Sequence, residues 1–212
     1  MLPEGSGCEP AGEKGAHEMG ETSDLDHAAR DGVPFRVRQI VARALELDIE
    51  DVRMESSLFA LGAESLDLVD MAFMIEAEYQ IQFPRTDFLE RASEHIDAEE
   101  LVVNGVITER GLELLRLGMP ELDPAVIKPG LRDIDFAQMI TVESFARITQ
   151  RLLDAKAEFP RECPHCGGNL IESRVMPEFN CSSCEETVPL PSGDEILLKD
   201  LLQLYQQVQD RR

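Results

Sequence analysis

Two pairs of cysteines constrain the fold of this chain more than any other feature of its sequence. They form the motifs Cys-Pro-His-Cys at residues 163–166 and Cys-Ser-Ser-Cys at residues 181–184, with 14 residues between the pairs. Each motif places two thiolates on a tight turn, and four thiolates make a tetrahedral zinc site. The spacing therefore predicts zinc as a cofactor with the ligands Cys163, Cys166, Cys181 and Cys184.

The surrounding segment, residues 160–191, resembles a zinc ribbon. The resemblance implies short strands around 170–175 and 187–190 that pair beneath the metal. A segment of this size cannot form a sufficient core, so we expect the metal to supply most of its folding free energy. We expect His165 to be a non-ligand, because four cysteines fill the site and leave no open position for catalysis. Redox chemistry at one cysteine pair is the alternative, which two matched pairs disfavour.

The charge of the chain bears on its partners. The sequence holds 42 acidic and 20 basic residues, for a net charge of −22. Such a chain is repelled by phosphate backbones and anionic membranes, so we expect neither nucleic acid nor a membrane as a partner. It is attracted to proteins with basic patches. The alternative is that the charge only keeps the protein soluble.

The chain starts without a basic and apolar leader, and no apolar stretch approaches bilayer length. We therefore expect a cytoplasmic protein, in which several cysteines indicate a metal site before disulfides. Cys8 stands alone and receives no role.

Residues 1–32 are rich in Gly, Glu, Asp and Ser, which predicts a disordered acidic tail. Apolar residues at helical spacing then predict a helix from Pro34 to about Leu47 and a second one from Ser65 to before Pro84. A further helix is expected to begin at the N-cap Thr141. Residues 192–212 have the pattern of a final amphipathic helix.

The intervening residues, about 85–140, have a weaker pattern. We expect helix within 88–101 and 109–117, with a turn at Asn104-Gly105 between them. Few aromatic residues and no Trp favour packed helices over a β-sandwich.

The segment Leu-Gly-Ala-Glu-Ser-Leu-Asp-Leu-Val-Asp, residues 61–70, carries the chemistry that we assign to the chain. A loop ends at Gly62, and Ser65 then stands at the first position of a helix, between acids. The helix N-terminus carries partial positive charge and free N–H groups. If the exposed hydroxyl were esterified to a phosphodiester, this helix end would stabilise the added anion.

This segment closely resembles the attachment signature of acyl carrier proteins, which reads Leu-Gly-Ala-Asp-Ser-Leu-Asp in many members. The resemblance extends over about 34–84 and resumes at 140–153, and Glu64 replaces the usual Asp. It implies an all-α fold: a four-helix bundle over 33–156, in which about 85–140 is an unusually long helical insertion.

The resemblance also implies a function. A phosphopantetheinyl transferase moves 4′-phosphopantetheine from coenzyme A onto Ser65, and the thiol of this arm carries acyl groups as thioesters. The pathway would be fatty-acid-like or polyketide-like biosynthesis, and the chain itself would have no catalytic residue. Two other interpretations of Ser65 are a simple N-cap and a nucleophile elbow, in which Asp67 would replace the second glycine.

One face of the helix after Ser65 is expected to meet partners. Leu66, Asp70, Phe73, Glu76 and Ala77 share this face by their spacing. Acids around apolar side chains suit brief, electrostatically steered docking. The resemblance implies that this surface docks onto basic patches of the transferase and of acyl ligases or synthases. The full candidate set is Glu64, Leu66, Asp67, Asp70, Phe73 and Glu76. Alternatively, Leu66 and Phe73 lie beneath the insertion.

The insertion itself has three possible uses: enlarging an apolar pocket for the acyl chain, docking a dedicated partner, or enlarging the core. We expect a monomeric carrier. The competing hypothesis is an interaction adaptor, a bundle that never carries an arm and is joined to a structural zinc ribbon.

Overall fold

The computed structural model describes residues 32–85 and 88–209. The predicted disordered tail, apart from residue 32, lies outside this range, as do residues 210–212 of the predicted final helix. The described helices are α2 (Val33–Ala44), α3 (Ser65–Tyr79), α4 (Phe88–Ser93), α5 (Ala98–Leu101), α6 (Glu109–Gly118), α7 (Val142–Ala157) and α8 (Gly193–Gln209), with 3-10 turns η1 (Ile49–Asp51), η2 (Asp133–Asp135) and η3 (Ala137–Met139). None of these described helices is long and apolar enough to cross a membrane.

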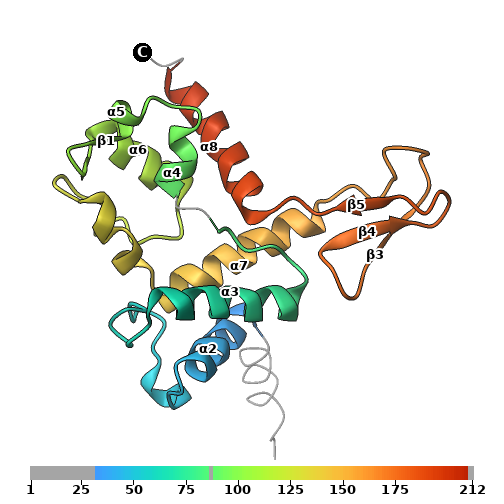
Figure 1. Cartoon of the computed structure of the whole chain (residues 1–212), viewed down its shortest axis with the longest axis horizontal. Helices are drawn as coiled ribbons and strands as arrows, with labels where there is room; N and C mark the ends of the chain where they lie inside the picture. The colour runs from blue at the N-terminus through green and yellow to red at the C-terminus, as the bar shows by residue number, and fades with distance from the viewer. Residues whose placement is uncertain (1–31, 86–87, 210–212) are drawn as a thin grey trace, which may run out of the picture.

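Helices α2, α3 and α7 pack together beside the insertion (Figure 1). Each helix turns an apolar stripe inward, as the spacing of their apolar residues predicts. The fully buried side chains at the centre include Val37, Val41, Met71, Ile75 and Val142. The predicted first helix ends at Ala44, three residues before Leu47, because Glu46 adopts a left-handed conformation with φ of 54°.

The loop between α2 and α3 is held against the start of α7. The N–H of Leu58 donates to the carbonyl of Ile140 at 3.0 Å, and the N–H of Val142 donates to that of Ser56 at 3.1 Å. As predicted, Thr141 caps α7: its Oγ1 accepts from the N–H of Ser144 at 3.1 Å. The loop that leads to Ser65 is therefore positioned by the helix that follows the insertion.

The insertion is less helical than predicted. Helix α4 ends at Ser93, and the short α5 leads into a hairpin of β1 (Val102–Val103) and β2 (Val106–Ile107). The predicted turn at Asn104-Gly105 closes this hairpin, with φ of 52° and 73° at the two residues. Positive φ at both positions matches the twist of a two-residue hairpin. Helix α6 then packs against α8.

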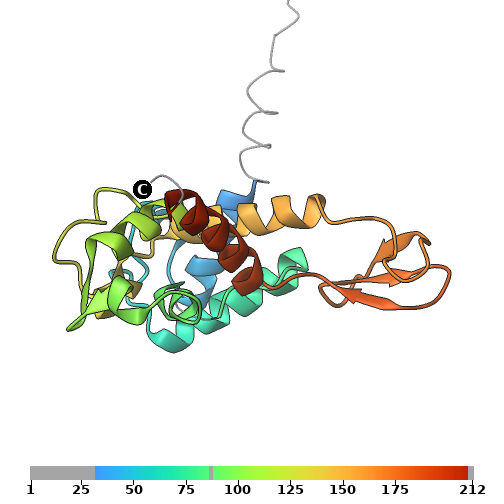
Figure 2. The same cartoon turned by 90° about the horizontal axis from the view of Figure 1, so that it is seen from above.

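The ribbon is a three-stranded antiparallel sheet that projects from one end of the helical part (Figure 2). Its strands are β3 (Leu170–Glu172), β4 (Glu178–Cys181) and β5 (Thr187–Pro189). The prediction that the first and last of these pair with each other is wrong, because β4 lies between them and pairs with both. Phe179 on β4 is fully buried in a small core of its own with Leu170 and Leu190.

Contacts on two sides fix the ribbon to the helices. The ring of Phe159, just after α7, stacks on that of Phe179 with centroids 5.1 Å apart. The Nζ of Lys156 donates to the carbonyl of Tyr79 at 2.9 Å and pairs with the carboxylate of Glu172 at 2.6 Å. Lys156 therefore links the C-terminal end of α3, the helix α7 and the first ribbon strand.

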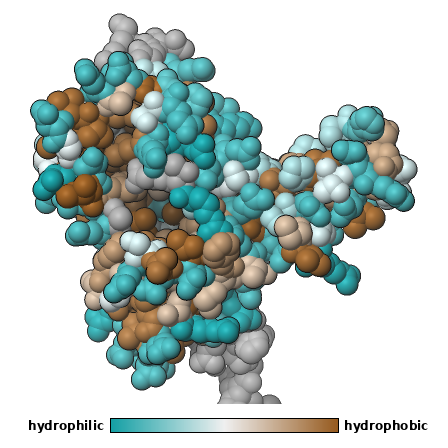
Figure 3. All heavy atoms as spheres, in the orientation of Figure 1, coloured by the Kyte–Doolittle hydropathy of each residue, from teal (hydrophilic) through white to brown (hydrophobic). Residues whose placement is uncertain are grey.

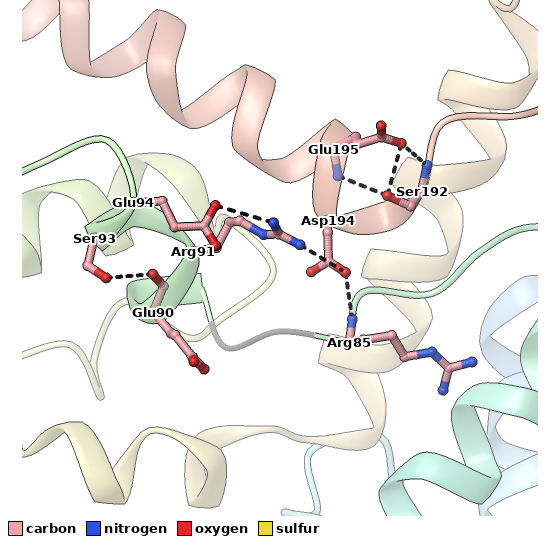
Figure 4. Close-up of polar contacts among 8 residues, drawn as sticks. All are labelled: Arg85, Glu90, Arg91, Ser93, Glu94, Ser192, Asp194 and Glu195. Atoms are coloured by element: carbon pink, nitrogen blue, oxygen red, sulfur yellow. Dashed lines mark hydrogen bonds and ion pairs between the residues drawn. The ribbon is translucent and has the colours of Figure 1, made fainter.

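Helix α8 returns from the ribbon to the segment that follows α3 (Figure 4). The carboxylate of Asp194, which is nearly buried, accepts from the N–H of Arg85 at 3.1 Å and pairs with Arg91 on α4 at 3.6 Å. Ser192 and Glu195 form reciprocal hydrogen bonds at the start of the helix. The C-terminal helix is thus an integral part of the structure around the insertion.

Candidate functional site

Ser65 is the first residue of α3 and is exposed. Its position follows from the preceding loop, in which Gly62 has φ of 96° and the N–H of Ala63 donates to the carbonyl of Leu58 at 3.0 Å. Ala63 and Leu58 are buried and anchor this loop. Gly62 supplies the left-handed conformation that a side chain would disfavour. The loop therefore delivers the Ser65 hydroxyl to the surface at a helix N-terminus.

The N-cap position of α3 belongs to Glu64 and not to Ser65. The carboxylate of Asp67 accepts from the N–H of Glu64 at 2.7 Å, which stabilises the first turn. The interpretation of Ser65 as a simple N-cap is therefore wrong. Its hydroxyl stands next to the partial positive charge of the helix end without serving as the cap, which suits the attachment of an anionic phosphodiester.

An apolar cavity of about 330 Å³ adjoins Ser65. Figure 3 shows hydrophobic side chains around a hollow between α3 and the insertion. Helix α3 contributes Leu68, Val69 and Ala72 to its wall, and α7 contributes two further residues. The remaining lining comes from the segments between and after these helices, with Phe83, Phe88, Met119, Phe136 and Leu197 among it. Residues of the insertion and of α8 thus close a cavity that begins at the candidate attachment site.

The predicted partner face is largely on the surface. Leu66 is 76% exposed and Phe73 is 55% exposed, and Val69 between them is 43% exposed. The alternative in which Leu66 and Phe73 lie beneath the insertion is therefore wrong. Glu64 and Asp70 are exposed as well, whereas Asp67 is half-buried at the helix start.

Glu76 is placed differently from the other acids of this face. Its carboxylate accepts from the N–H of Phe83 at 2.7 Å and pairs with the guanidinium of Arg85 at 2.6 Å. The same guanidinium lies over the ring of Phe73, 4.1 Å from its centroid. The charge of Glu76 is therefore compensated within the chain, and this acid does not present a free carboxylate to a basic patch. No feature of the sequence marks Arg85 as its partner.

The four predicted ligands come together in the ribbon. Their sulfur atoms all lie within 4.8 Å of one another, with Cys163 3.8 Å from Cys184 and Cys166 3.5 Å from Cys181. A disulfide needs about 2 Å between sulfur atoms. A tetrahedron with zinc–sulfur bonds of about 2.3 Å has edges of about 3.8 Å. The spacing therefore fits a four-thiolate metal site, and His165 is exposed outside this group.

The two cysteine turns have the same local design. Residues Gly167 and Glu185, each just after the second cysteine of its pair, are left-handed with φ of 73° and 58°. The N–H groups of Cys184 and Ser183 directed at the sulfur of Cys181 lower the pKa of that thiol to about 6. This favours the thiolate, the form that binds a metal. The thiol of Cys181 is thus prepared as a ligand by the backbone of its own turn.

Gly168 allows the two turns to approach. A Cβ atom on this residue would lie 2.5 Å from the Oγ of Ser183 and 3.1 Å from the sulfur of Cys181. Both distances are shorter than ordinary packing contacts. The close approach of the two cysteine turns therefore favours a glycine at this position.

Comparison with known proteins matches the part of the chain that holds Ser65. Residues 36–93 match the family described as the phosphopantetheine attachment site. The acyl carrier protein of Campylobacter curvus is 38% identical over 52 residues, which are 24% of this chain and 68% of that protein. The acyl carrier protein of Clostridium acetobutylicum is 40% identical over 50 residues, 23% of this chain and 65% of that protein. No solved structure matches significantly. On the exposed serine, its helix and these relatives, the chain belongs to the acyl carrier protein family.

Proposed function

We propose that this chain carries acyl groups as thioesters on a 4′-phosphopantetheine arm attached to Ser65. The observation that carries the proposal is the exposed Ser65 hydroxyl at the N-terminus of α3, next to an apolar cavity. The chain acts as the substrate of partner enzymes and has no catalytic residue of its own. The pathway is fatty-acid-like or polyketide-like biosynthesis.

Attachment of the arm is a phosphoryl transfer onto Ser65. The Oγ atom forms a bond to the phosphorus atom that bears the pantetheine group in coenzyme A. The bond from this phosphorus to the bridging pyrophosphate oxygen breaks, and adenosine 3′,5′-bisphosphate leaves. The hydroxyl proton passes to a base of the transferase or to water. The new phosphodiester is an anion, and the N–H groups and dipole of α3 stabilise it.

The cavity beside Ser65 is the site that shelters the acyl chain. Its volume of about 330 Å³ lies at the lower end of the range of ligand pockets, which is about 300–1,000 Å³. Its apolar walls favour a hydrocarbon, since each buried methylene contributes about 0.8 kcal/mol. Because Phe88, Met119 and Phe136 line it, we assign to the insertion the use of enlarging this pocket.

The four-cysteine cluster holds zinc in a structural role. Zinc with four thiolate ligands cross-links the two turns and leaves no open position. The ribbon core contains few large buried side chains, with Phe179 as its centre. The metal therefore supplies much of the folding free energy of the ribbon.

The division of the chain follows from these roles. We assign the carrier unit to residues 33–156, the ribbon to 160–191 and the last helix to 192–212. The exposed part of α3 around Asp70 meets the transferase and the acyl ligases or synthases through their basic patches, and the protein acts as a monomer.

Mass spectrometry tests this function against the adaptor hypothesis. The full chain is co-expressed with a phosphopantetheinyl transferase, and its intact mass is measured. We expect a gain of one phosphopantetheine group in the wild type and none in Ser65→Ala. Ser93→Ala, which removes another exposed serine, is the matched control and gains the group like the wild type. An unchanged wild-type mass with several transferases favours the adaptor.

A further inference from the structure

The loop between β3 and β4 holds two apolar side chains in solvent. Val175 is 79% exposed and Met176 is 55% exposed. The loop is nevertheless well defined, because the Oγ of Ser173 accepts from the N–H groups of Val175 at 3.3 Å and Met176 at 3.2 Å. The N–H of Glu178 also donates to the carbonyl of Met176 at 2.8 Å. Apolar side chains that an ordered loop keeps exposed are a mark of an interaction surface.

This loop forms a groove with the C-terminal half of α3. The groove has a volume of about 540 Å³. Phe73 and Ala77 of α3 form one wall with Gln80 just after the helix, and Val175 and Met176 line the other. Figure 1 shows the ribbon beyond the C-terminal end of α3. The contacts of Lys156 with Tyr79 and Glu172, described above, fix the distance between the two walls.

The charged groups that line the groove are compensated within the chain. Glu76 pairs with Arg85, whose guanidinium stacks on Phe73. The carboxylate of Asp194 pairs with the guanidinium of Arg91 at 3.6 Å. The groove therefore offers apolar contact area without a free charge at its base. Asp70, which is exposed on the face of α3 that leads to the groove, adds negative charge at its edge. The matching partner is an apolar protrusion flanked by basic side chains.

The position of the groove relative to Ser65 selects the partner. Phe73 follows Ser65 by eight residues, which is about 12 Å along a helix. Exposed Leu66 and Val69 continue the apolar surface between them. A stable interface covers about 800 Å² on each partner, a patch roughly 30 Å across. A protein that binds over Ser65 therefore also reaches the groove.

The enzyme that attaches the arm needs such direct binding. It must bring the phosphorus of coenzyme A within bonding distance of the Ser65 Oγ, so it must cover the surface around this residue. Enzymes that act on the thiol afterwards can reach it through the length of the arm. Resting on the function proposed above, we infer that the phosphopantetheinyl transferase docks in the groove between α3 and the β3–β4 loop of the ribbon. The ribbon thus supplies part of the recognition surface for modification of Ser65.

Steady-state kinetics of Ser65 modification test this inference. The reagents are the full zinc-loaded chain, coenzyme A and a phosphopantetheinyl transferase from the source organism. For the double variant Val175→Ser, Met176→Ser we expect the KM for the carrier to rise roughly tenfold with kcat unchanged, since docking contacts are lost equally in ground and transition states. Ile171→Ser is the matched control: Ile171 is 56% exposed on β3 and does not line the groove.

A second variant probes the opposite wall without touching the ribbon. Ala77→Glu places a charged side chain in the groove from α3 and should also raise the KM, with unchanged zinc content. If both variants keep the wild-type KM while the wild type is modified normally, the docking inference is overturned and the groove serves another partner. If the wild type itself gains no arm, the proposed carrier function is overturned as well.

Discussion

The length of the acyl chain should set the thermal stability of the loaded protein up to a limit given by the cavity beside Ser65. A methylene occupies about as much space as a water molecule, ~30 Å³. The cavity volume of about 330 Å³ then holds about ten methylene groups. Each contributes about 0.8 kcal/mol by burial and loses about 0.5 kcal/mol through ordering of one torsion, a net of about 0.3 kcal/mol. An acyl chain that fills the cavity therefore stabilises the loaded protein by about 3 kcal/mol.

Differential scanning calorimetry of a loaded series measures this effect. For a domain of this size, 1 kcal/mol shifts the Tm by roughly 2–4 °C. We therefore expect the Tm to rise by about 1 °C for each added methylene, relative to the acetyl form, and to level off near ten. Ala72 lines the cavity and is buried. In Ala72→Leu the Tm should therefore level off at an acyl chain about three methylenes shorter.

Ala98→Leu, which adds the same atoms at an exposed position of α5 outside the cavity, serves as the control. A Tm that does not depend on chain length would refute the assignment of this cavity to the cargo. A plateau that Ala72→Leu leaves in place would do the same.

Three further predictions concern the parts that hold the site in place. Removal of zinc with a chelator should unfold the ribbon while the helices remain. Far-UV circular dichroism should keep its helical signal, and amide exchange should show loss of protection confined to residues 163–190. Thr141→Ala should lower the free energy of unfolding by about 1 kcal/mol, because the N-cap of α7 is lost; urea denaturation measures this. Arg151→Met should cost about 3 kcal/mol in the same assay, because it leaves the buried carboxylate of Glu121, 2.9 Å from Arg151, without its cation.

Each of these predictions has an outcome that would contradict it, and the arginine variant also has a matched comparison. Arg147→Met breaks an exposed pair with Glu143 and should cost less than about 1 kcal/mol. Equal costs for the two arginine variants would contradict the role given to the buried pair. Likewise, a Thr141→Ala variant as stable as the wild type, or a ribbon that keeps its protection without metal, would show that the cap or the metal contributes little.

Local signals in the sequence were sufficient for several elements. Gly62 before Ser65 and Thr141 before an apolar stripe mark the starts of α3 and α7, because turn and cap chemistry act within a few residues. The cluster of four cysteines follows from the spacing of the two pairs, since each pair forms its own turn.

Other features depend on contacts between distant residues. The strand β4 alternates polar and apolar residues over only four positions, Glu178–Cys181, and its pairing with both neighbours defines it. The pair of Glu76 with Arg85, and the contact of Arg85 with Asp194, 109 residues away, leave no periodic signal. The cavity likewise needs Ser65 and Leu197 brought together by the fold.

The most direct test is the covalent state of residue 65 in the protein purified from the cells that make it. Proteolysis followed by tandem mass spectrometry should locate a phosphopantetheine group on the peptide that spans Ser65, with part of it in acylated form. A peptide found only with an unmodified serine, under growth conditions in which other carriers of the cell bear their arms, would contradict the account.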